Sequence, residues 1–241
     1  MHMYKAGGTS MRKLIRDQYP QADVVEVDGA IPELEAWRAQ QETLRHSQDL
    51  LLGHQFFGNH DFVRPGASYI TVLRDPIERV ISFYYYVLRM PDHYLYRYGF
   101  EPQMSLRELY EKTRCVELDN LQVRMMNPQP THHPVMGSVD DRMMEIAERN
   151  LRYIADHGVV GVVEHMPELL EVLERDEGWD VSTMTRSNAT ARRPSAESLD
   201  PETLDIIVRS NQYDIRLHKL ATELFQERLH RSRSGAAVIA E

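Results

Sequence analysis

The chain has 241 residues, of which 42% are hydrophobic and 27% are charged, and its formal net charge at pH 7 is −9. This length and mixed composition fit one globular domain and exclude a disordered or fibrous chain. The acidic balance argues against general affinity for nucleic acid or anionic membranes, because both reward clustered Lys and Arg. Cys115 is the single cysteine, so an intramolecular disulfide is excluded and a cysteine-based zinc site is not expected.

The sequence carries no recognisable membrane segment or secretory signal. No run approaches about 18 uninterrupted apolar residues. The N-terminal residues lack a basic stretch followed by an apolar one. We therefore expect a cytoplasmic protein with no membrane segment in the chain.

Apolar residues recur along the chain with alternating strand and helix spacing. In the first third of the chain, the pattern predicts a strand at 1–4, a helix through Met11, Leu14 and Ile15, and strands at 24–27 and 50–52 on either side of a helix at 34–48. A strand at 69–73 is followed by a helix, and further helices are predicted at 106–112, 119–126 and 140–156. The pattern ends with a strand at 159–163 and one long helix from Pro201. This order is typical of an α/β fold with a central parallel sheet flanked by helices, and ligands bind such sheets outside the carboxyl ends of the strands. We expect a single domain over 1–231 and a flexible C-terminal tail over 232–241.

A glycine-rich loop, Lys5-Ala6-Gly7-Gly8-Thr9-Ser10, joins the first predicted strand to the first predicted helix. Its two glycines let the backbone approach an anion closely, the helix N-terminus offers free N–H groups, and the lysine adds a positive charge. The loop therefore fits a phosphate-type ligand, although a tight turn with an exposed lysine is an alternative. It is not a P-loop, because the G-x-x-x-x-G-K-[ST] order is absent.

The second motif is the run YITVLRDPIERVISFYY, in which a β-branched strand passes through Arg74 and Asp75 into a helix. Arg74 at the strand end offers a guanidinium group with several N–H donors, and Ser82 in the helix offers a hydroxyl. Both groups can bind the same phosphate. Arg79, Ser82 and Tyr86 share a helix face, which we expect to meet a ligand. The alternative is an Arg74–Asp75 surface pair and a serine that faces solvent.

The third motif places His54 at the end of the apolar run Leu50-Leu51-Leu52 and among aromatic residues. A neutral imidazole can accept a proton near physiological pH, so His54 is a candidate general base. A purely structural histidine is the alternative.

Together, these motifs resemble those of the carbohydrate sulfotransferases that use 3′-phosphoadenosine 5′-phosphosulfate (PAPS), especially the heparan sulfate 2-O-sulfotransferase-like group. The glycine-rich loop resembles the family's P-K-T-G-G-T-S loop, with Tyr4 and Ala6 in place of its proline and threonine. Leu73 to Tyr84 resembles its R-D-P-x-x-R-x-x-S-x-Y segment, and Gly53-His54 stands where the family has a Gly-His at a strand end. Weaker similarities follow at 119–124, 187–193 and 213–214.

The resemblance implies a P-loop-NTPase-like sulfotransferase fold and transfer of a sulfuryl group from PAPS to a hydroxyl of a carbohydrate or another small acceptor. The residues that the family would use for the 5′-phosphosulfate are Lys5, Gly7, Gly8, Thr9 and Ser10, those for the 3′-phosphate are Arg74 and Ser82, and the base is His54. Lys5 would also stabilise the charge on the leaving adenosine 3′,5′-bisphosphate. This scheme requires no metal, and we interpret Asp92-His93 and His132-His133 as solvated loop residues.

Two other functions remain as alternatives. A small-molecule kinase would use Asp75 to hold Mg²⁺, although the missing P-loop order counts against it. A nucleotide- or glycan-binding module that has lost catalysis is the other alternative, and the short first strand is its main support. Two further groups of residues could either bind the acceptor substrate or have only a structural role. They are the tyrosines at 84–86, 94, 96 and 98, and the arginines at 186, 192 and 193.

Overall fold

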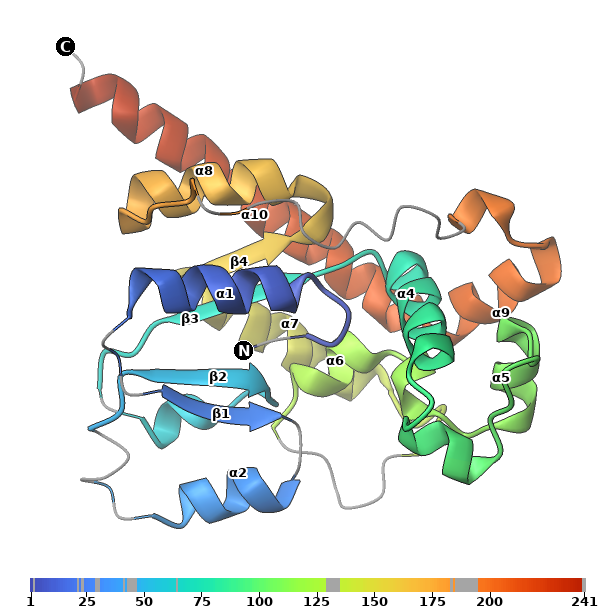
Figure 1. Cartoon of the computed structure of the whole chain (residues 1–241). Helices are drawn as coiled ribbons and strands as arrows, with labels where there is room; N and C mark the ends of the chain where they lie inside the picture. Colours follow the sequence, from blue (N-terminus) through green and yellow to red (C-terminus); the bar gives the residue numbers. More distant parts are fainter. Residues whose placement is uncertain are drawn as a thin grey trace.

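Strands and helices alternate in the computed structural model, which describes residues 1–239 except 2, 21, 23, 29–30, 41, 43–46, 64, 129–134, 183 and 185–194. The predicted mixed α/β class is confirmed, with short parallel strands among helices (Figure 1). The main elements are α1 (Gly8–Gln18), β1 (Val24–Asp28), α2 (Ile31–Arg38), β2 (Leu50–His54), β3 (Tyr69–Leu73), α4 (Pro76–Arg89), α5 (Leu106–Lys112), α6 (Leu121–Met125), α7 (Asp141–Asp156), β4 (Gly158–Val162), α8 (Met166–Glu177), α9 (Pro201–Ser210) and α10 (Gln212–Ile239). Short 3₁₀ helices lie at Asn59–Asp61, Tyr94–Tyr98, Val116–Leu118, Val163–His165 and Ala196–Ser198.

The strands form two separate two-stranded parallel sheets within the described residues. In the first, β1 pairs with β2 in a register that sets Val24 opposite Leu50. In the second, β3 pairs with β4 in a register that sets Tyr69 opposite Gly158. The described part of the chain therefore shows two small parallel sheets and not the central parallel sheet that was predicted. Figure 1 shows the N-terminus between β2 and β3.

Met1, Met3 and Tyr4, the described residues of this segment, do not form the predicted strand. The Ala6 N–H donates to the Met3 carbonyl at 3.3 Å and Lys5 has a φ of 65°, so the chain turns directly after Met3. The Met1 amino group donates to the Ile70 carbonyl at 2.9 Å, and Met3 is fully buried. The segment thus packs beside β3 as a turn, because the backbone leaves the extended region too early for strand pairing.

Local sequence signals set the junction between β3 and α4. The Asp75 carboxylate accepts a hydrogen bond from the Glu78 N–H at 2.9 Å and so caps the helix, and Pro76 occupies the first helical position. The apolar face of α4 is buried and carries Val80, Ile81, Phe83 and Val87. Because the helix begins at Pro76, Arg74 is left at the carboxyl end of β3, as predicted.

The main hydrophobic core surrounds β4, against which α7, α8 and α10 pack (Figure 1). The helix predicted at 140–156 is confirmed as α7, and four apolar residues at helical spacing on it are fully buried: Met144, Ala147, Leu151 and Ile154. None of the helices in the described ranges is both long and apolar enough to cross a membrane.

Three predicted elements differ in their boundaries. The helix predicted at 34–48 is described in part, as α2, which begins earlier, at Ile31, while residues 41 and 43–46 lie outside the described ranges. Trp37 Nε1 donates to Gln48 Oε1 at 2.7 Å. The helix predicted at 119–126 is shortened to α6, because Asn120 adopts a left-handed conformation with a φ of 46°. The last strand begins one residue earlier than predicted, at Gly158.

The long helix predicted from Pro201 is interrupted at Asn211, where α9 ends and α10 begins. Asn211 is fully buried. Its Nδ2 donates to the carbonyls of Leu118 at 2.8 Å and Ile207 at 2.9 Å, and its Oδ1 accepts from the Asn120 N–H at 3.2 Å. A buried amide needs such partners, and the non-helical backbone of Asn211 (φ −127°, ψ 24°) lets it reach them.

Helix α10 continues past the predicted domain boundary at 232 and ends at Ile239. The Ser232 hydroxyl donates to Asp176 Oδ1 at 2.6 Å, and Arg233 Nη2 donates to Glu171 Oε2 at 2.6 Å. Both acceptors belong to α8. The first residues assigned to the tail therefore contact the folded domain through α8.

Candidate functional site

The loop at Lys5–Ser10 leads into the N-terminus of α1. Gly7 is the N-cap residue and has a φ of 75°, in the left-handed region that favours glycine. A Cβ at Gly7 would also lie 3.3 Å from Met166 Cε. Among the described residues no side chain caps α1, and the first turn of α1 contains no acidic residue. The backbone at Gly7 and Gly8 therefore suits an anion; the Thr9 side chain lies outside the described atoms.

Lys5 is held between the end of β3 and α4. Its carbonyl accepts a hydrogen bond from Arg74 Nη1 at 3.1 Å. Its Nζ lies 4.1 Å from the centre of the Tyr86 ring, a cation–π contact. Tyr86, which we expected to face a ligand, thus supports the loop cation from α4.

The guanidinium of Arg74 links the first two motifs. Besides the bond to the Lys5 carbonyl, its Nη2 lies 3.6 Å from Glu78 Oε2, and the side chain is 16% exposed. Asp75 caps α4 and so does not form the surface pair with Arg74 that was the alternative interpretation. The guanidinium group of Arg74 therefore stands next to the glycine-rich loop.

Two side chains for which the sequence predicts no role, Gln122 and Glu164, fix the backbone around Arg74. Gln122 accepts from the Arg74 N–H and donates to the Arg74 carbonyl, both at 2.9 Å. Glu164 Oε1 accepts from the Asp75 N–H at 2.9 Å, and its Oε2 lies 3.0 Å from His218 Nε2. Burial raises the pKa of Glu164, but hydrogen bonds from His218 and the Asp75 N–H outweigh this effect and hold the pKa below its ordinary value.

His54 ends β2, as predicted, and lies beside the glycine-rich loop. Its ring stacks on Tyr4, with centroids 3.7 Å apart and planes 9° apart. His60, in contrast, belongs to an aromatic cluster with Phe57 and Tyr69, and its Nδ1 lies 2.8 Å from the Tyr69 hydroxyl. The structure thus places His54 of the third motif beside the glycine-rich loop of the first motif.

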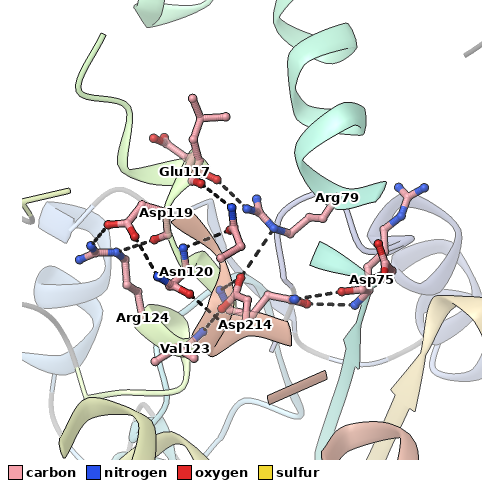
Figure 2. A network of polar contacts seen from close by, with 12 residues as sticks. Asp75, Arg79, Glu117, Asp119, Asn120, Val123, Arg124 and Asp214 are labelled. Atoms are coloured by element: carbon pink, nitrogen blue, oxygen red, sulfur yellow. Dashed lines mark hydrogen bonds and ion pairs between the residues drawn. The ribbon is translucent and has the colours of Figure 1, made fainter. Parts of the chain in front are cut away.

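Ser82 and Arg79 lie on α4 in different environments. Ser82 is half-buried, and its hydroxyl has no hydrogen-bond partner within the described ranges. Arg79 is fully buried, its Nη2 donates to the Glu117 carbonyl at 2.8 Å, and its Nε lies 4.0 Å from Asp214 Oδ2 (Figure 2). The prediction that Arg79 faces a ligand is therefore wrong, because α10 and the 3₁₀ helix at Val116–Leu118 cover that side of α4.

A buried polar network surrounds Asp214 (Figure 2). Its carboxylate accepts from the N–H groups of Gln122 at 3.0 Å and Val123 at 2.8 Å. Burial raises the pKa of Asp214, although the nearby Arg79 opposes this shift. A neighbouring buried ion pair joins Arg124 to Asp119. The weak similarities at 119–124 and 213–214 marked these segments, but nothing in the sequence indicated that Asp214 contacts Gln122 or that Gln122 contacts Arg74.

Most of the other residues considered in the sequence fall into structural roles or outside the described ranges. The Tyr84 hydroxyl donates to the Met104 carbonyl at 2.7 Å, and that of Tyr94 to Glu117 Oε1 at 2.6 Å. Tyr98 is the most exposed large hydrophobic side chain among the described residues, at 73%. The His93 ring caps the 3₁₀ helix at Tyr94–Tyr98. Outside the described residues lie His132, His133, Arg186, Arg192 and Arg193.

Comparison with known proteins identifies a family. A comparison with curated proteins gives no match. The model of the sulfotransferase family matches residues 4–221, a range that includes the Lys5 loop, the β2 end at His54, the β3–α4 junction and the network around Asp214. Because the match covers most of the chain and all the segments that meet at Arg74, this chain belongs to the sulfotransferase family.

Proposed function

We propose that this chain transfers a sulfuryl group from PAPS to a hydroxyl group of a carbohydrate or another small acceptor. Sulfuryl transfer follows from the family, and the finer assignment rests on the site. The observation that carries it is the 3.1 Å hydrogen bond from Arg74 Nη1 to the Lys5 carbonyl, which joins two cationic segments 69 residues apart in sequence. A nucleotide with a 5′-phosphosulfate and a 3′-phosphate needs two anion sites at a fixed separation.

The residues present fit such a donor. Gly7, where an added Cβ would lie 3.3 Å from Met166 Cε, and the first turn of α1, which has no side-chain cap, suit the 5′-phosphosulfate, together with the ammonium of Lys5. We assign Gly8, Thr9 and Ser10 to the same group because they form that first turn. Arg74 and the half-buried hydroxyl of Ser82 would hold the 3′-phosphate, since a guanidinium fork suits phosphate oxygens.

In the proposed reaction these residues mainly align and stabilise charge. When bound, PAPS supplies the activated sulfuryl group and leaves as adenosine 3′,5′-bisphosphate. Lys5 and the loop N–H groups stabilise the negative charge that grows on the leaving side. Transfer of this kind needs alignment more than covalent help from the protein. The Tyr86 ring beneath Lys5 keeps the ammonium at the loop.

His54 is the proposed general base. A ring nitrogen of His54 would take the proton of the acceptor hydroxyl as that oxygen attacks. Two features support this role: His54 ends a strand beside the loop, and its ring is stacked on Tyr4, which limits its rotation. The resemblance of the motifs to carbohydrate sulfotransferases supports a glycan as the acceptor.

The kinase alternative is disfavoured by the position of Asp75. That carboxylate accepts the Glu78 N–H and caps α4, so it is already engaged. Thermal melting distinguishes the two functions, because a ligand that binds the native state raises its stability. We expect adenosine 3′,5′-bisphosphate to raise the melting temperature more than AMP or Mg-ATP does. Equal or greater stabilisation by Mg-ATP would contradict the proposal.

The same measurement tests the role of Arg74. Arg74→Ala should remove most of the preference for the 3′-phosphate, because a charge-assisted contact is worth about 1.5–3 kcal/mol. Turnover of PAPS with a panel of glycans and small alcohols separates an enzyme from a module that only binds. Nucleotide binding without turnover of any acceptor would favour the binding module.

A further inference from the structure

Gln122 is fully buried in α6, and its side-chain amide faces the backbone of Arg74. Its Oε1 accepts from the Arg74 N–H and its Nε2 donates to the Arg74 carbonyl, and both bonds measure 2.9 Å. The pairing of β3 with β4 ends at Leu73. Gln122 therefore satisfies both backbone groups of the first residue beyond the strand ladder, where the backbone would otherwise have no strand partner.

Gln122 is itself held by the buried carboxylate of Asp214, which Figure 2 labels. Asp214 accepts the N–H groups of Gln122 at 3.0 Å and Val123 at 2.8 Å, and its own N–H donates to Asn120 Oδ1 at 3.0 Å. Arg79 lies beside it, and both Arg79 and Asp214 are fully buried. The start of α6 cannot shift toward or away from Arg74 without breaking these bonds.

Arg74 connects α6 to the glycine-rich loop, because its backbone is bonded to Gln122 and its side chain contacts Lys5. Its guanidinium donates to the Lys5 carbonyl at 3.1 Å and lies 3.6 Å from Glu78. Direct contacts thus run from Asp214 through Gln122 and Arg74 to Lys5. A displacement of the Arg74 backbone would move the guanidinium fork relative to the loop, although the loop would keep its own N–H groups and Lys5 charge.

We infer that Gln122 is a positioning residue, which holds Arg74 at a fixed place relative to Lys5 and so gives the site its selectivity for nucleotides that carry a 3′-phosphate. This inference rests on the proposed function of Arg74. Contacts from a planar fork depend on its placement, whereas the loop contacts to a 5′-phosphate do not involve Gln122. Loss of Gln122 should therefore weaken the binding of adenosine 3′,5′-bisphosphate far more than that of AMP.

The test is Gln122→Met, which keeps the side-chain length and removes both hydrogen bonds. We expect the wild-type chain to bind adenosine 3′,5′-bisphosphate at least about 10-fold more tightly than AMP, the size of one charge-assisted contact. In Gln122→Met this ratio should fall by about 5-fold or more while the affinity for AMP stays within about 2-fold, as titration calorimetry can measure. Exchange of the Arg74 amide hydrogen, followed by NMR, should be at least about 10-fold faster in the variant, because the N–H loses its acceptor.

Asn150→Leu is the matched control. Asn150 is a buried amide of α7 whose Nδ2 donates to the Met126 carbonyl at the other end of α6, at 2.7 Å. Its loss should destabilise the chain to a similar degree without touching Arg74. We expect the nucleotide ratio and the Arg74 exchange rate to stay as in the wild type. If Gln122→Met does not fold, Gln122→Glu is measured instead, because it keeps the acceptor for the Arg74 N–H but lacks the donor for its carbonyl.

The outcomes separate this inference from the proposed function. A wild-type preference that survives in the Gln122 variant overturns the inference and leaves the proposed function intact. An equal loss in Asn150→Leu also overturns it, because general destabilisation then explains the effect. If the wild-type chain does not prefer adenosine 3′,5′-bisphosphate to AMP, both the proposed function and the role of Gln122 in selectivity are overturned. The exchange rate of the Arg74 amide hydrogen then decides whether Gln122 positions Arg74. An unchanged exchange rate in the Gln122 variant would overturn the positioning role as well.

Discussion

The rings of Tyr4 and His54 lie parallel, with centroids 3.7 Å apart and planes 9° apart. Tyr4 directly precedes Lys5 and stands where the resembling sulfotransferases have proline. A stacked partner covers one face of an imidazole and leaves its edge, with both ring nitrogens, for hydrogen bonding. The contact therefore ties the candidate base at the end of β2 to the candidate donor loop.

His54→Ala should reduce turnover without a comparable loss of nucleotide binding. A positioned general base contributes about 10²–10⁴-fold in rate, so we expect a fall in kcat of that size. The affinity for adenosine 3′,5′-bisphosphate should stay within about 2-fold, because the base contacts the acceptor. His230→Ala, at an exposed histidine of α10, is the control and should keep its activity. Near-native turnover in folded His54→Ala would place the base elsewhere, with His60 as the next residue to test.

Substitutions of Tyr4 test whether the stacking orients His54. Tyr4→Phe keeps the ring and should keep kcat near the wild-type value. Tyr4→Ala removes the ring and should lower kcat by about 10-fold, because a misplaced base loses alignment. Steady-state kinetics on both variants provide the measurement. Equal activities of the two variants would show that the stacked ring does not contribute.

Lys5→Ala should damage both nucleotide affinity and turnover, in contrast to His54→Ala. The ammonium is proposed to contact the bound donor and the leaving group, so its loss should cost about 10-fold or more in each quantity. Lys13→Ala is the control, since Lys13 lies on α1 with its side chain 65% exposed and paired with Asp17. Titration calorimetry and initial rates measure the two effects. A Lys5→Ala variant that loses affinity but keeps kcat would contradict the leaving-group role.

Glu164 should make stability depend on pH in the acid range. Its pKa is lowered in the folded chain, so the folded state binds fewer protons there than the unfolded state does. The resulting stabilisation is present above the unfolded value of about 4.5 and is lost as the pH falls through the lowered folded value. Glu164→Gln lacks this contribution, so the difference in melting temperature between the two proteins should be largest near neutral pH and shrink below pH 4.5. Asp214, whose pKa is raised by burial, acts in the opposite direction but is present in both proteins. A constant difference across this range would contradict the prediction.

The sequence by itself determined the parts of the site that depend on neighbours a few residues away. Glycine at a left-handed N-cap, an aspartate followed by proline at a helix start, and a β-branched run that ends at Arg74 each specify their own backbone through local sterics and short-range hydrogen bonds. These signals correctly placed the loop before α1, the β3–α4 junction and the strand end at His54.

Tertiary structure alone decided how these pieces meet. Gln122 contacts Arg74 across 48 residues, and Asn211 interrupts the last helix by bonding Leu118 across 93 residues. Arg79 has the helical spacing of a ligand-facing residue, yet it is buried because α10 covers it. Periodicity tells which residues share a face of an element, but the choice between core, solvent and site on that face is made by whichever distant segment packs against it.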